Sequence, residues 1–443
     1  MLHDFDVVIL GGGPSGTAAG LTLLKREGLK VALVEQSDYS TARIGESLTP
    51  SIRPLLEYLD LWPVFQSSQS LEAYGSQACW GSENISSLDY LFTLHGAGWS
   101  LNRTAFDRSL ADTFQDRGGT LLTKTQFLDC EEDEDFRWSV RVQEDGGMSR
   151  EIKTDFLIDA TGRRGFLSRQ LGITRIMHDQ LVGVGCFAER SADHPLEQQL
   201  LVEACPYGWW YSSPLPNNRL AVVLMTDTDL ASEMKASRQE NWLQLLAAMP
   251  QTAQRTQGVV FPDKPRSFLA FSSYLRRAGG RNWVAVGDAL AAHDPLSSSG
   301  IPHAISTGVH GARVAANTLF GDKQLLASYQ ESSQLDFSQY LKTHWQYYTK
   351  EKRWMNAPFW RRRTTALRLD PELIVADTEQ GLTSTDTVHL SPTQAEALIA
   401  SCKPGLAAHQ IVRQFADKHP ELPDERIILG LQEMMLSSTA YSN

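Results

Sequence analysis

The sequence predicts an α/β protein with a Rossmann-like dinucleotide-binding domain, an inserted, mainly antiparallel β-sheet domain and a small helical C-terminal domain. Three observations support this fold class. A glycine-rich turn joins an apolar strand to a helix near the N-terminus, residues 172–282 are rich in strand patterns, and residues beyond 328 are helical and aromatic. A chain of 443 residues is also long enough for two or three domains.

The first element is an apolar strand that runs directly into the glycine-rich turn. Gly11, Gly13 and Gly16 occupy the G-x-G-x-x-G positions, which permit a tight turn, a close approach of pyrophosphate and close packing of helix on strand. Pro14 and Ser15 stand at the start of the following helix, where free N–H groups and the positive dipole end favour phosphate. The unit therefore predicts a dinucleotide site.

A second strand ends in Glu35, nineteen residues after the third glycine. A carboxylate at this point can accept hydrogen bonds from both ribose hydroxyls and would repel a 2′-phosphate. The next loop lies beside a bound dinucleotide, so Arg43 either pairs with a phosphate or covers the cofactor ring, or is a surface arginine. Glu46 follows in the same loop, at the start of the helix predicted over residues 52–59.

The domain continues with a helix that begins near Arg103 and a strand at residues 120–122. The acidic residues 131–135 are expected to form the solvated turn of a hairpin. Another apolar strand, residues 155–159, closes on the small residues 160–162. These elements predict further strands of the same sheet.

Residues 172–282 consist mainly of strand patterns, which are interrupted by one predicted amphipathic helix at about residues 232–249. We expect a separate sheet domain inserted in the first domain. Residues 283–286 return to the first domain as a buried strand followed by Asp288, and a long helix is expected over residues 304–319.

The net charge of −11 argues against nucleic acid or an anionic membrane as the main partner. The sequence has no run of eighteen apolar residues, and its first strand begins almost at once, so we expect a cytoplasmic protein without membrane insertion. The five cysteines lack C-x-x-C spacing, so neither a metal site nor a disulfide framework is expected.

Four motifs stand in an order that resembles the FAD-dependent aromatic hydroxylases of the p-hydroxybenzoate hydroxylase fold. They are residues 11–35, 159–162, 287–288 and 294–300. Residues 43–47 and 294–301 look particularly like the branch that contains the flavin-dependent halogenases. The resemblance covers about residues 1–330.

The resemblance implies FAD as the cofactor, with Glu35 at the adenosine ribose, Arg103 near the pyrophosphate and Asp288 on the ribityl chain or pyrophosphate. The helix start near residue 300 would stabilise the negative charge that arises on the reduced flavin. In full, the expected FAD-binding residues are Gly11, Gly13, Pro14, Ser15, Gly16, Glu35, Arg43, Arg103, Asp288, Pro295, Gly300 and Ile301.

Three residues are candidates for acid or base catalysis, because their motifs place them near the reaction face. They are Glu46, His293 and Asp294. Each also has a purely structural alternative. No metal ligand is expected.

Two departures from the halogenases favour hydroxyl transfer. Those enzymes use a lysine between the first nucleotide unit and the sheet domain, but this chain has none between Lys30 and Lys124. They also carry a W-x-W-x-I-P motif, where residues 208–214 have adjacent aromatic residues instead. No second G-x-G-x-x-G follows, so electrons would come from a transiently bound reduced nicotinamide or from a separate reductase.

The C-terminal part carries a local basic and aromatic cluster, which either packs on the FAD-binding domain or lines a groove for an acidic or peptidic partner. Residues 388–390 read as a short strand before three helices, the first beginning at Ser391 and Pro392. This layout resembles a winged-helix fold, including the small peptide-binding modules of enzymes that modify ribosomally made peptides.

The expected domains are residues 1–75, 98–171 and 280–327 for FAD binding, 76–97 and 172–279 for the substrate, and 328–443 for the C-terminal helical domain. The expected function is an FAD-dependent monooxygenase that uses molecular oxygen to hydroxylate an electron-rich aromatic ring through a flavin C4a-hydroperoxide. The electrophilic oxygen of such a species is attacked by rings such as indole or phenol.

The chain combines a C-terminal module with a halogenase-like FAD-binding part that has no lysine between Lys30 and Lys124. In this it resembles the flavoprotein monooxygenases that hydroxylate a protein tryptophan in biogenesis of the tryptophylquinone cofactor of quinohemoprotein amine dehydrogenase. This resemblance implies a polypeptide partner that carries the target tryptophan. The alternatives are a small-molecule phenol or indole hydroxylase, a flavin reductase of polyprenyl double bonds, and a non-catalytic flavin-binding chaperone.

Overall fold

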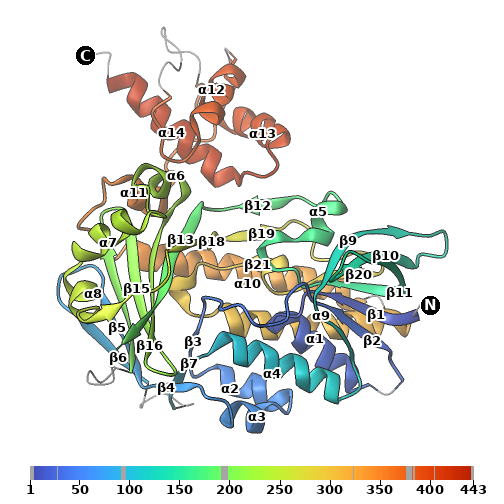
Figure 1. Cartoon of the computed structure of the whole chain (residues 1–443). Helices are drawn as coiled ribbons and strands as arrows, with labels where there is room; N and C mark the ends of the chain where they lie inside the picture. The colour runs from blue at the N-terminus through green and yellow to red at the C-terminus, as the bar shows by residue number, and fades with distance from the viewer. Residues whose placement is uncertain are drawn as a thin grey trace.

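The structure is a computed structural model that describes residues 4–26, 28–90, 96–190, 198–322, 324–375, 382, 385–403 and 405–440. Residues 91–95 and 191–197, which fall in or beside the predicted substrate domain, lie outside the described residues. Figure 1 shows the two large β-sheets side by side, with helices α12, α13 and α14 gathered at one end of the molecule. The predicted α/β class and its three parts are confirmed.

The first β-sheet has the strand order β8-β2-β1-β11-β10-β9, and β20 also pairs with β11. Its parallel strands are β1 (Asp4–Leu10), β2 (Val31–Val34), β8 (Thr120–Leu122), β11 (Ser149–Asp159) and β20 (Trp283–Ala285). The hairpin β9 (Thr125–Glu132) and β10 (Trp138–Glu144) extends it in antiparallel fashion. The acidic segment therefore does form the turn of a hairpin, as predicted.

Helices cover this sheet and bring the glycine-rich turn to its carboxyl edge. They are α1 (Pro14–Leu24), α4 (Arg103–Asp116), α9 (Gly300–Leu319) and α10 (Gln324–Tyr348), with the shorter α2 (Ile52–Tyr58), α3 (Trp62–Gln66) and α5 (Phe166–Gln170). Helices α1 and α9 approach closely because Gly308 faces the backbone of α1. A Cβ atom at Gly308 would lie 2.3 Å from the carbonyl oxygen of Ser15.

The second large sheet has the order β17-β13-β16-β15-β14-β5-β6, with β18 on β13, and only its β14–β5 pair is parallel. Its strands are β5 (Gly75–Cys79), β6 (Ser86–Asp89), β13 (Leu181–Arg190), β14 (Gln199–Cys205), β15 (Gly208–Leu215), β16 (Arg219–Asp227), β17 (Val259–Val260) and β18 (Arg266–Leu269). This is the predicted, mainly antiparallel insert.

Two small three-stranded sheets join the large ones. They are formed by β3 (Ser47–Leu48), β7 (Gly98–Ser100) and β4 (Leu71–Ala73), and by β12 (Arg175–Met177), β19 (Ser273–Leu275) and β21 (Ala291–Ala292). The β3–β7 pairing fixes the loop that carries Glu46 beside the start of α4, since the Leu101 N–H donates to the Glu46 carbonyl oxygen.

The single helix predicted over residues 232–249 is wrong. The structure has α6 (Thr228–Glu233), α7 (Gln239–Ala247) and α8 (Pro250–Arg255). Lys235 adopts φ +50° between α6 and α7, in the left-handed region where a right-handed helix cannot continue. The amphipathic pattern continues across this break, so it gives no sign of it.

Helix α10 packs with the first domain, because Tyr329 and Phe337 belong to the hydrophobic core of that domain. Helices α12 (Pro392–Ser401), α13 (Ala408–Lys418) and α14 (Asp424–Ala440) enclose a separate core that includes Ile411 and Phe415. The domain boundaries themselves stay predictions.

The short strand predicted at residues 388–390 is wrong, since these residues form a bend. The Val388 N–H donates to the Glu433 carboxylate at 2.9 Å instead of to a neighbouring strand. In the described part of residues 365–440, strand pairing is limited to one isolated bridge between Ile374 and Ala407. The winged-helix likeness is therefore limited to the three helices.

The basic cluster of α11 (Pro358–Thr364) is neutralised within the chain. Arg361 pairs with Glu433 at 2.7 Å, Arg362 with Asp229, and Arg363 with Asp227 at 2.7 Å. These ion pairs attach α11 to the insert sheet and to α14. They favour the packing alternative over a groove for an acidic partner.

In the part of the chain that the structure describes, no helix combines the length and the apolar character that crossing a membrane would require.

Candidate active site

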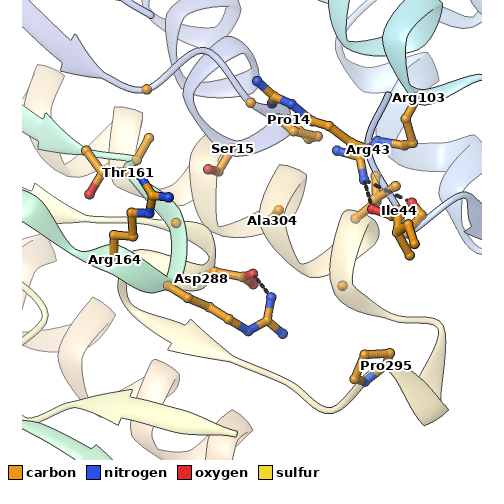
Figure 2. A pocket seen from close by; sticks show the side chains of 18 of the residues that line it. Pro14, Ser15, Arg43, Ile44, Arg103, Thr161, Arg164, Asp288, Pro295 and Ala304 are labelled. Carbon is orange, nitrogen blue, oxygen red and sulfur yellow. Dashed lines mark hydrogen bonds and ion pairs between the residues drawn. The ribbon is translucent and has the colours of Figure 1, made fainter. Parts of the chain in front are cut away.

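A cavity of about 510 Å³ lies between the carboxyl edge of the first sheet and the insert sheet. Figure 2 shows Pro14 and Ser15, Asp288, and Pro295 around the same hollow, with Arg43 and Arg103 along another side. Eleven of the twelve predicted FAD residues line this cavity; the exception is Gly16. The three predicted acid/base candidates line it as well.

The three glycines of the turn have the different roles that their spacing predicts. Gly11 has φ +105°, and a Cβ atom there would lie 2.3 Å from the carbonyl oxygen of Ala160. A Cβ atom at Gly16 would lie 1.9 Å from the carbonyl oxygen of Gly11, so Gly16 serves the packing of α1 on β1. A Cβ atom at Gly13 would have no described atom within 4 Å, so a ligand can approach the backbone there.

Two helices present their N-termini to the cavity without a side-chain cap. Helix α1 begins after Gly13 and helix α9 after Ser299, and neither has an acidic residue in its first turn. The free N–H groups and the positive dipole ends are therefore available to an anionic ligand. Ile301 lines the cavity at the start of α9.

Glu35 is buried at the end of β2 and holds the turn in place. Its Oε2 accepts from the Gly12 N–H at 2.7 Å, and its Oε1 accepts from the N–H and the hydroxyl of Ser37. Each carboxylate oxygen has two lone pairs, so Oε2 keeps acceptor capacity for a ribose hydroxyl.

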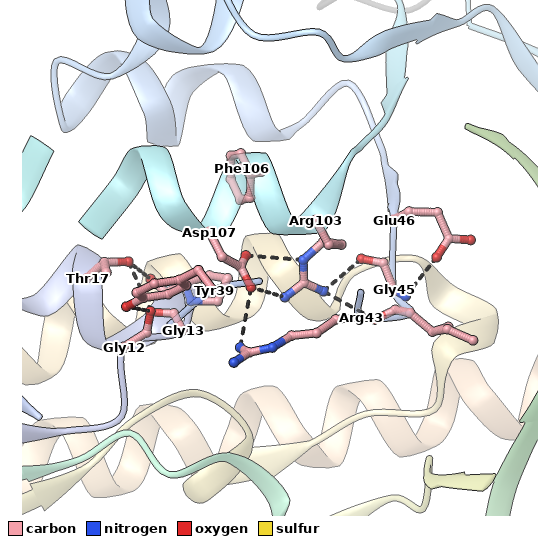
Figure 3. Close-up of polar contacts among 12 residues, drawn as sticks. Gly12, Gly13, Thr17, Tyr39, Arg43, Gly45, Glu46, Arg103, Phe106 and Asp107 are labelled. Atoms are coloured by element: carbon pink, nitrogen blue, oxygen red, sulfur yellow. Dashed lines mark hydrogen bonds and ion pairs between the residues drawn. The ribbon is translucent and has the colours of Figure 1, made fainter. Parts of the chain in front are cut away.

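Asp107 joins the two predicted arginines, as Figure 3 shows. Its carboxylate lies 2.9 Å from Arg103 Nη2 and 3.5 Å from Arg43 Nη1, and its side chain is only 1% exposed. Arg103 also donates to the carbonyl oxygens of Ile44 and Gly45. Sequence analysis missed Asp107, although its spacing of four residues from Arg103 on a predicted helix was an available signal.

Arg163 was also missed. It pairs with Asp288 and donates to the carbonyl oxygen of His293 at 2.7 Å, so it ties the short turn after β20 to the loop before α9. Asp288 lines the cavity with a partly exposed side chain. The signal was an arginine directly after the small residues that close β11.

The insert sheet supplies an aromatic and apolar wall at the other end of the cavity. Trp209 and Tyr211 of β15 face the cavity, whereas Trp210 faces the opposite core against Trp242. Leu200, Val202, Leu296 and Ile44 complete this wall.

Strand alternation corrects our interpretation of residues 208–214. When W-x-W-x-I-P is aligned on Pro214, the two motif tryptophans correspond to Trp209 and Tyr211, which share one face because side chains alternate along a strand. The segment therefore does have spaced aromatic residues. It departs from the motif at two positions, where Tyr211 replaces the second tryptophan and Ser213 replaces the isoleucine. The missing lysine stays as the clearer difference from the halogenases.

Glu46 is 1% exposed. Its Oε2 accepts from the Gly45 N–H at 2.8 Å, whereas the buried Oε1 has no partner of hydrogen-bond geometry among the described residues. Burial raises the pKa of Glu46, although the Gly45 N–H, the nearby Arg103 charge and the Ser213 hydroxyl oppose this rise. A buried carboxyl with a raised pKa is suited to accepting and releasing a proton.

His293 is held among aromatic rings. It stacks on Tyr340 at 4.1 Å between ring centroids and lies 4.2 Å from the ring of His303. Burial and the neighbouring His303 lower its pKa well below the ordinary value, so the ring is neutral at pH 7. This environment disfavours His293 as a general acid.

Asp294 has a full set of partners. Its Oδ1 accepts from the Leu296 N–H at 2.8 Å, and its Oδ2 accepts from Tyr348 at 2.7 Å and lies 3.1 Å from His344 Nε2. Burial alone would raise the pKa of Asp294, but these hydrogen bonds keep it below the ordinary value. The geometry favours a positioning role for Asp294 over proton transfer.

Comparison with known proteins agrees with this geometry. A family model described as FAD binding domain matches residues 4–344. The chain belongs to this family. The matched residues include the glycine-rich turn and the acidic end of β2, and both line the cavity.

Among curated proteins, the chain is 36% identical over 366 residues to the putative FAD-dependent oxidoreductase LodB of Marinomonas mediterranea, which covers 82% of this chain and 97% of that protein. It is 28% identical over 344 residues to the tryptophan 2-halogenase of Chondromyces crocatus. That match covers 73% of this chain but 63% of the halogenase, so this chain spans just under two thirds of that relative's length.

Two solved structures show the same fold. The myxobacterial chondrochloren halogenase CndH has a TM-score of 0.76 at 20% identity, over 85% of this chain and 87% of that chain. The peptidyl tryptophan dihydroxylase QhpG has a TM-score of 0.68 at 20% identity, over 94% of this chain and 99% of that chain.

These comparisons confirm the predicted family, the FAD cofactor and the prediction of a flavin-dependent enzyme with the fold of the halogenases and hydroxylases. The roles of individual residues in FAD binding and catalysis stay predictions.

Proposed function

We propose that this protein is a monooxygenase that hydroxylates an electron-rich aromatic ring, and that the ring belongs to a tryptophan in a polypeptide partner. The modification would be a step in the biogenesis of a tryptophylquinone cofactor. The observation that carries the proposal is one continuous cavity, in which the FAD-binding turn and an aromatic wall with Trp209 and Tyr211 face the same space.

The polypeptide part of the proposal is supported by the fold shared with QhpG, a peptidyl tryptophan dihydroxylase essential for tryptophylquinone cofactor biogenesis. The lack of a lysine between Lys30 and Lys124 supports hydroxylation over halogenation. The first observation supports a polypeptide substrate, and the second supports a hydroxylated product.

In this proposal the polar end of the cavity holds the cofactor. Glu35 binds the adenosine ribose, the N-terminus of α1 and Arg103 bind the pyrophosphate, and Asp288 binds the ribityl chain. When bound, reduced FAD would use molecular oxygen to supply an electrophilic oxygen atom to the substrate. The start of α9, beside Pro295, would lie along the edge of the flavin ring that becomes negative on reduction.

The apolar end would hold the substrate ring. Trp209 and Tyr211 pack against it and, with Leu296, exclude water from the reacting atoms. Once oxygen is added, the ring carbon must lose its proton to become aromatic again. Glu46 is the best placed of the three candidates to take this proton, because His293 is held between rings and Asp294 is saturated with hydrogen bonds.

Electrons are proposed to come from a transiently bound reduced nicotinamide or from a separate reductase. The described residues contain one glycine-rich βαβ turn of the dinucleotide type, at α1, and the mainly antiparallel insert sheet lacks such a unit among them. A chemical reductant therefore replaces the natural donor in the test.

The test mixes the FAD-loaded protein, reduced anaerobically with dithionite, with buffer containing ¹⁸O₂ and unfolded polypeptides that each carry one tryptophan. We expect a polypeptide whose mass rises by an incorporated ¹⁸O atom at its tryptophan. Free tryptophan and a simple phenol serve as competing substrates, and bromide is added in a parallel reaction.

Each alternative gives a different product. Faster hydroxylation of the free compounds would contradict the polypeptide substrate, and a brominated product would contradict hydroxylation. Flavin reoxidation without any modified aromatic ring would overturn the monooxygenase proposal altogether. The Glu46→Gln variant keeps the size of the side chain and should bind FAD normally while forming product about 100-fold more slowly.

A further inference from the structure

A second, small cavity of about 30 Å³ lies directly behind the first. Arg43, Glu46 and Arg103 line both cavities and therefore form the wall between them. The second cavity is also bounded by Phe187 of β13 and by residues 215–217 and 219 at the β15–β16 turn.

Among the described residues, Glu46 is the acidic residue that lines both cavities. The arginines beside it are engaged elsewhere. Arg103 donates to Asp107 through Nε and Nη2, and its Nη1 donates to the backbone carbonyl oxygens of Ile44 and Gly45. Arg43 pairs with Asp107 and Glu35.

Glu46 is therefore near positive charge but not held in an ion pair. Its Oε1 is buried and has no partner of hydrogen-bond geometry among the described residues. The Ser213 hydroxyl, which also lacks a partner of hydrogen-bond geometry in the described part of the chain, acts on the Glu46 carboxyl from nearby. Buried polar atoms are nearly always hydrogen-bonded, so the Glu46 carboxyl has capacity for a further partner such as a proton or a water molecule.

The second cavity has the size and chemistry of a water site. Its volume of about 30 Å³ exceeds the roughly 10–15 Å³ that a cavity needs to hold one water molecule, and a buried water needs two to four polar partners. Asn102, Thr104, Asn217 and Arg219 supply polar groups around it. Asn217 lies in the exposed β15–β16 turn, which leads from the cavity toward solvent.

We propose that this second cavity is the exit for the proton that Glu46 takes from the substrate. The inference rests on the proposed function for the origin of the proton. The C–H bond of the oxygenated ring breaks, its electron pair returns to the ring, and the proton binds the Glu46 carboxylate. Glu46 then transfers that proton to a water molecule in the second cavity, which passes it to solvent and leaves the carboxylate ready for another cycle.

The first test measures the exit without requiring turnover. At a pH low enough to protonate the Glu46 carboxylate, its carboxyl group gives an infrared C=O stretching band, assigned by its loss in Glu46→Gln, and the shift of this band in D₂O reports how quickly the proton exchanges. Thr104→Val replaces the hydroxyl with a methyl group of similar size, and Thr104→Ile adds about one further methyl group toward the second cavity. Thr113→Val, on the same helix α4 but outside both cavities, is the matched control.

We expect the band to shift about tenfold more slowly in Thr104→Ile, to a smaller degree in Thr104→Val, and at the wild-type rate in Thr113→Val. Exchange at the wild-type rate in both Thr104 variants, with melting temperatures showing that they fold, would overturn the proposed exit.

The second test uses product formation. Thr104→Ile should slow hydroxylation about tenfold in the wild-type background but add nothing to Glu46→Gln, because the two residues act in series. Additive effects would contradict the route. If wild-type protein forms no oxygenated product, the proposed function fails while the infrared result still decides the exit. If product forms and Thr104→Ile matches wild type in both tests, the exit alone fails.

Discussion

Tyr348 donates a hydrogen bond of 2.7 Å to Asp294, although 54 residues separate them in the sequence. The same phenolic oxygen accepts a hydrogen bond of 2.9 Å from Trp209 Nε1. Tyr348 is the last residue of α10, so the C-terminal end of this helix connects the loop before α9 to the aromatic wall of the cavity. Helix α10 therefore helps to shape the site.

Replacing Tyr348 with phenylalanine should destabilise the protein by about 1–3 kcal/mol, because one change leaves both Trp209 Nε1 and an oxygen of Asp294 short of a partner in the buried interior. Denaturant unfolding followed by tryptophan fluorescence measures the loss. Tyr347→Phe is the control, since that side chain is 49% exposed. Equal stability of the two variants would show that the buried hydrogen bonds contribute nothing net.

The glycine-rich turn gives a paired prediction. Gly16→Ala places a methyl group within 1.9 Å of the Gly11 carbonyl oxygen and should abolish stable folding, since backbone must move to admit it. Gly13→Ala meets no atom within 4 Å and should fold normally but bind FAD more weakly, because the methyl group projects into the space proposed for pyrophosphate.

Thermal melting and FAD retention after gel filtration distinguish the two variants. Normal FAD affinity in folded Gly13→Ala would contradict the placement of the pyrophosphate at this turn.

The parts of the site that are contiguous in sequence are the parts that sequence analysis predicts well. Gly13 and Glu35 belong to one βαβ unit, whose spacing is set by the lengths of a turn, a helix and a strand. Asp107 was also within reach, four residues after Arg103 on a predicted helix. It was overlooked because acidic side chains on helices are usually solvated.

Contacts made by distant segments depend on tertiary structure. Arg163 meets Asp288 only because β11 and β20 pair side by side, which brings together residues 125 apart in the sequence. The contact of Tyr348 with Asp294 likewise requires α10 to lie against the loop before α9. The local pattern at either position gives no sign of its partner.

Two ion pairs on helix α4 with the same i, i+4 spacing should differ in strength. Asp107 is 1% exposed and serves two arginines, so Asp107→Asn should cost about 3–5 kcal/mol by leaving buried charge uncompensated. Asp112 is 44% exposed and pairs with Arg108, so Asp112→Asn should cost less than about 1 kcal/mol. Urea unfolding of both variants measures the difference, and similar costs would mean that solvent or a relaxed helix screens the arginines.

The C-terminal helices should be selectively sensitive to acid because of Glu433. Its carboxylate accepts hydrogen bonds from Thr387 and the Val388 N–H, and it lies 3.0 Å from His389 Nδ1 and 2.7 Å from Arg361. Burial alone would raise the pKa of Glu433, but hydrogen bonds and the interaction with His389 lower it from 4.5 to about 2.

A folded-state pKa below the unfolded value means that this stabilisation is fully present above about pH 4.5 and is lost as the pH falls toward 2. The contribution is up to about 3 kcal/mol for a shift of this size. Because α12, α13 and α14 enclose their own core, their amide protection factors, which correct for slower intrinsic exchange in acid, should fall below pH 4 before those of the first sheet.

Glu433→Gln should remove most of this pH dependence, and the control Glu396→Gln, at an exposed position on α12, should retain it. Exchange mass spectrometry between pH 7 and pH 3 measures both. Acid-induced opening of the first sheet before these helices would contradict the assignment of the acid sensitivity to Glu433.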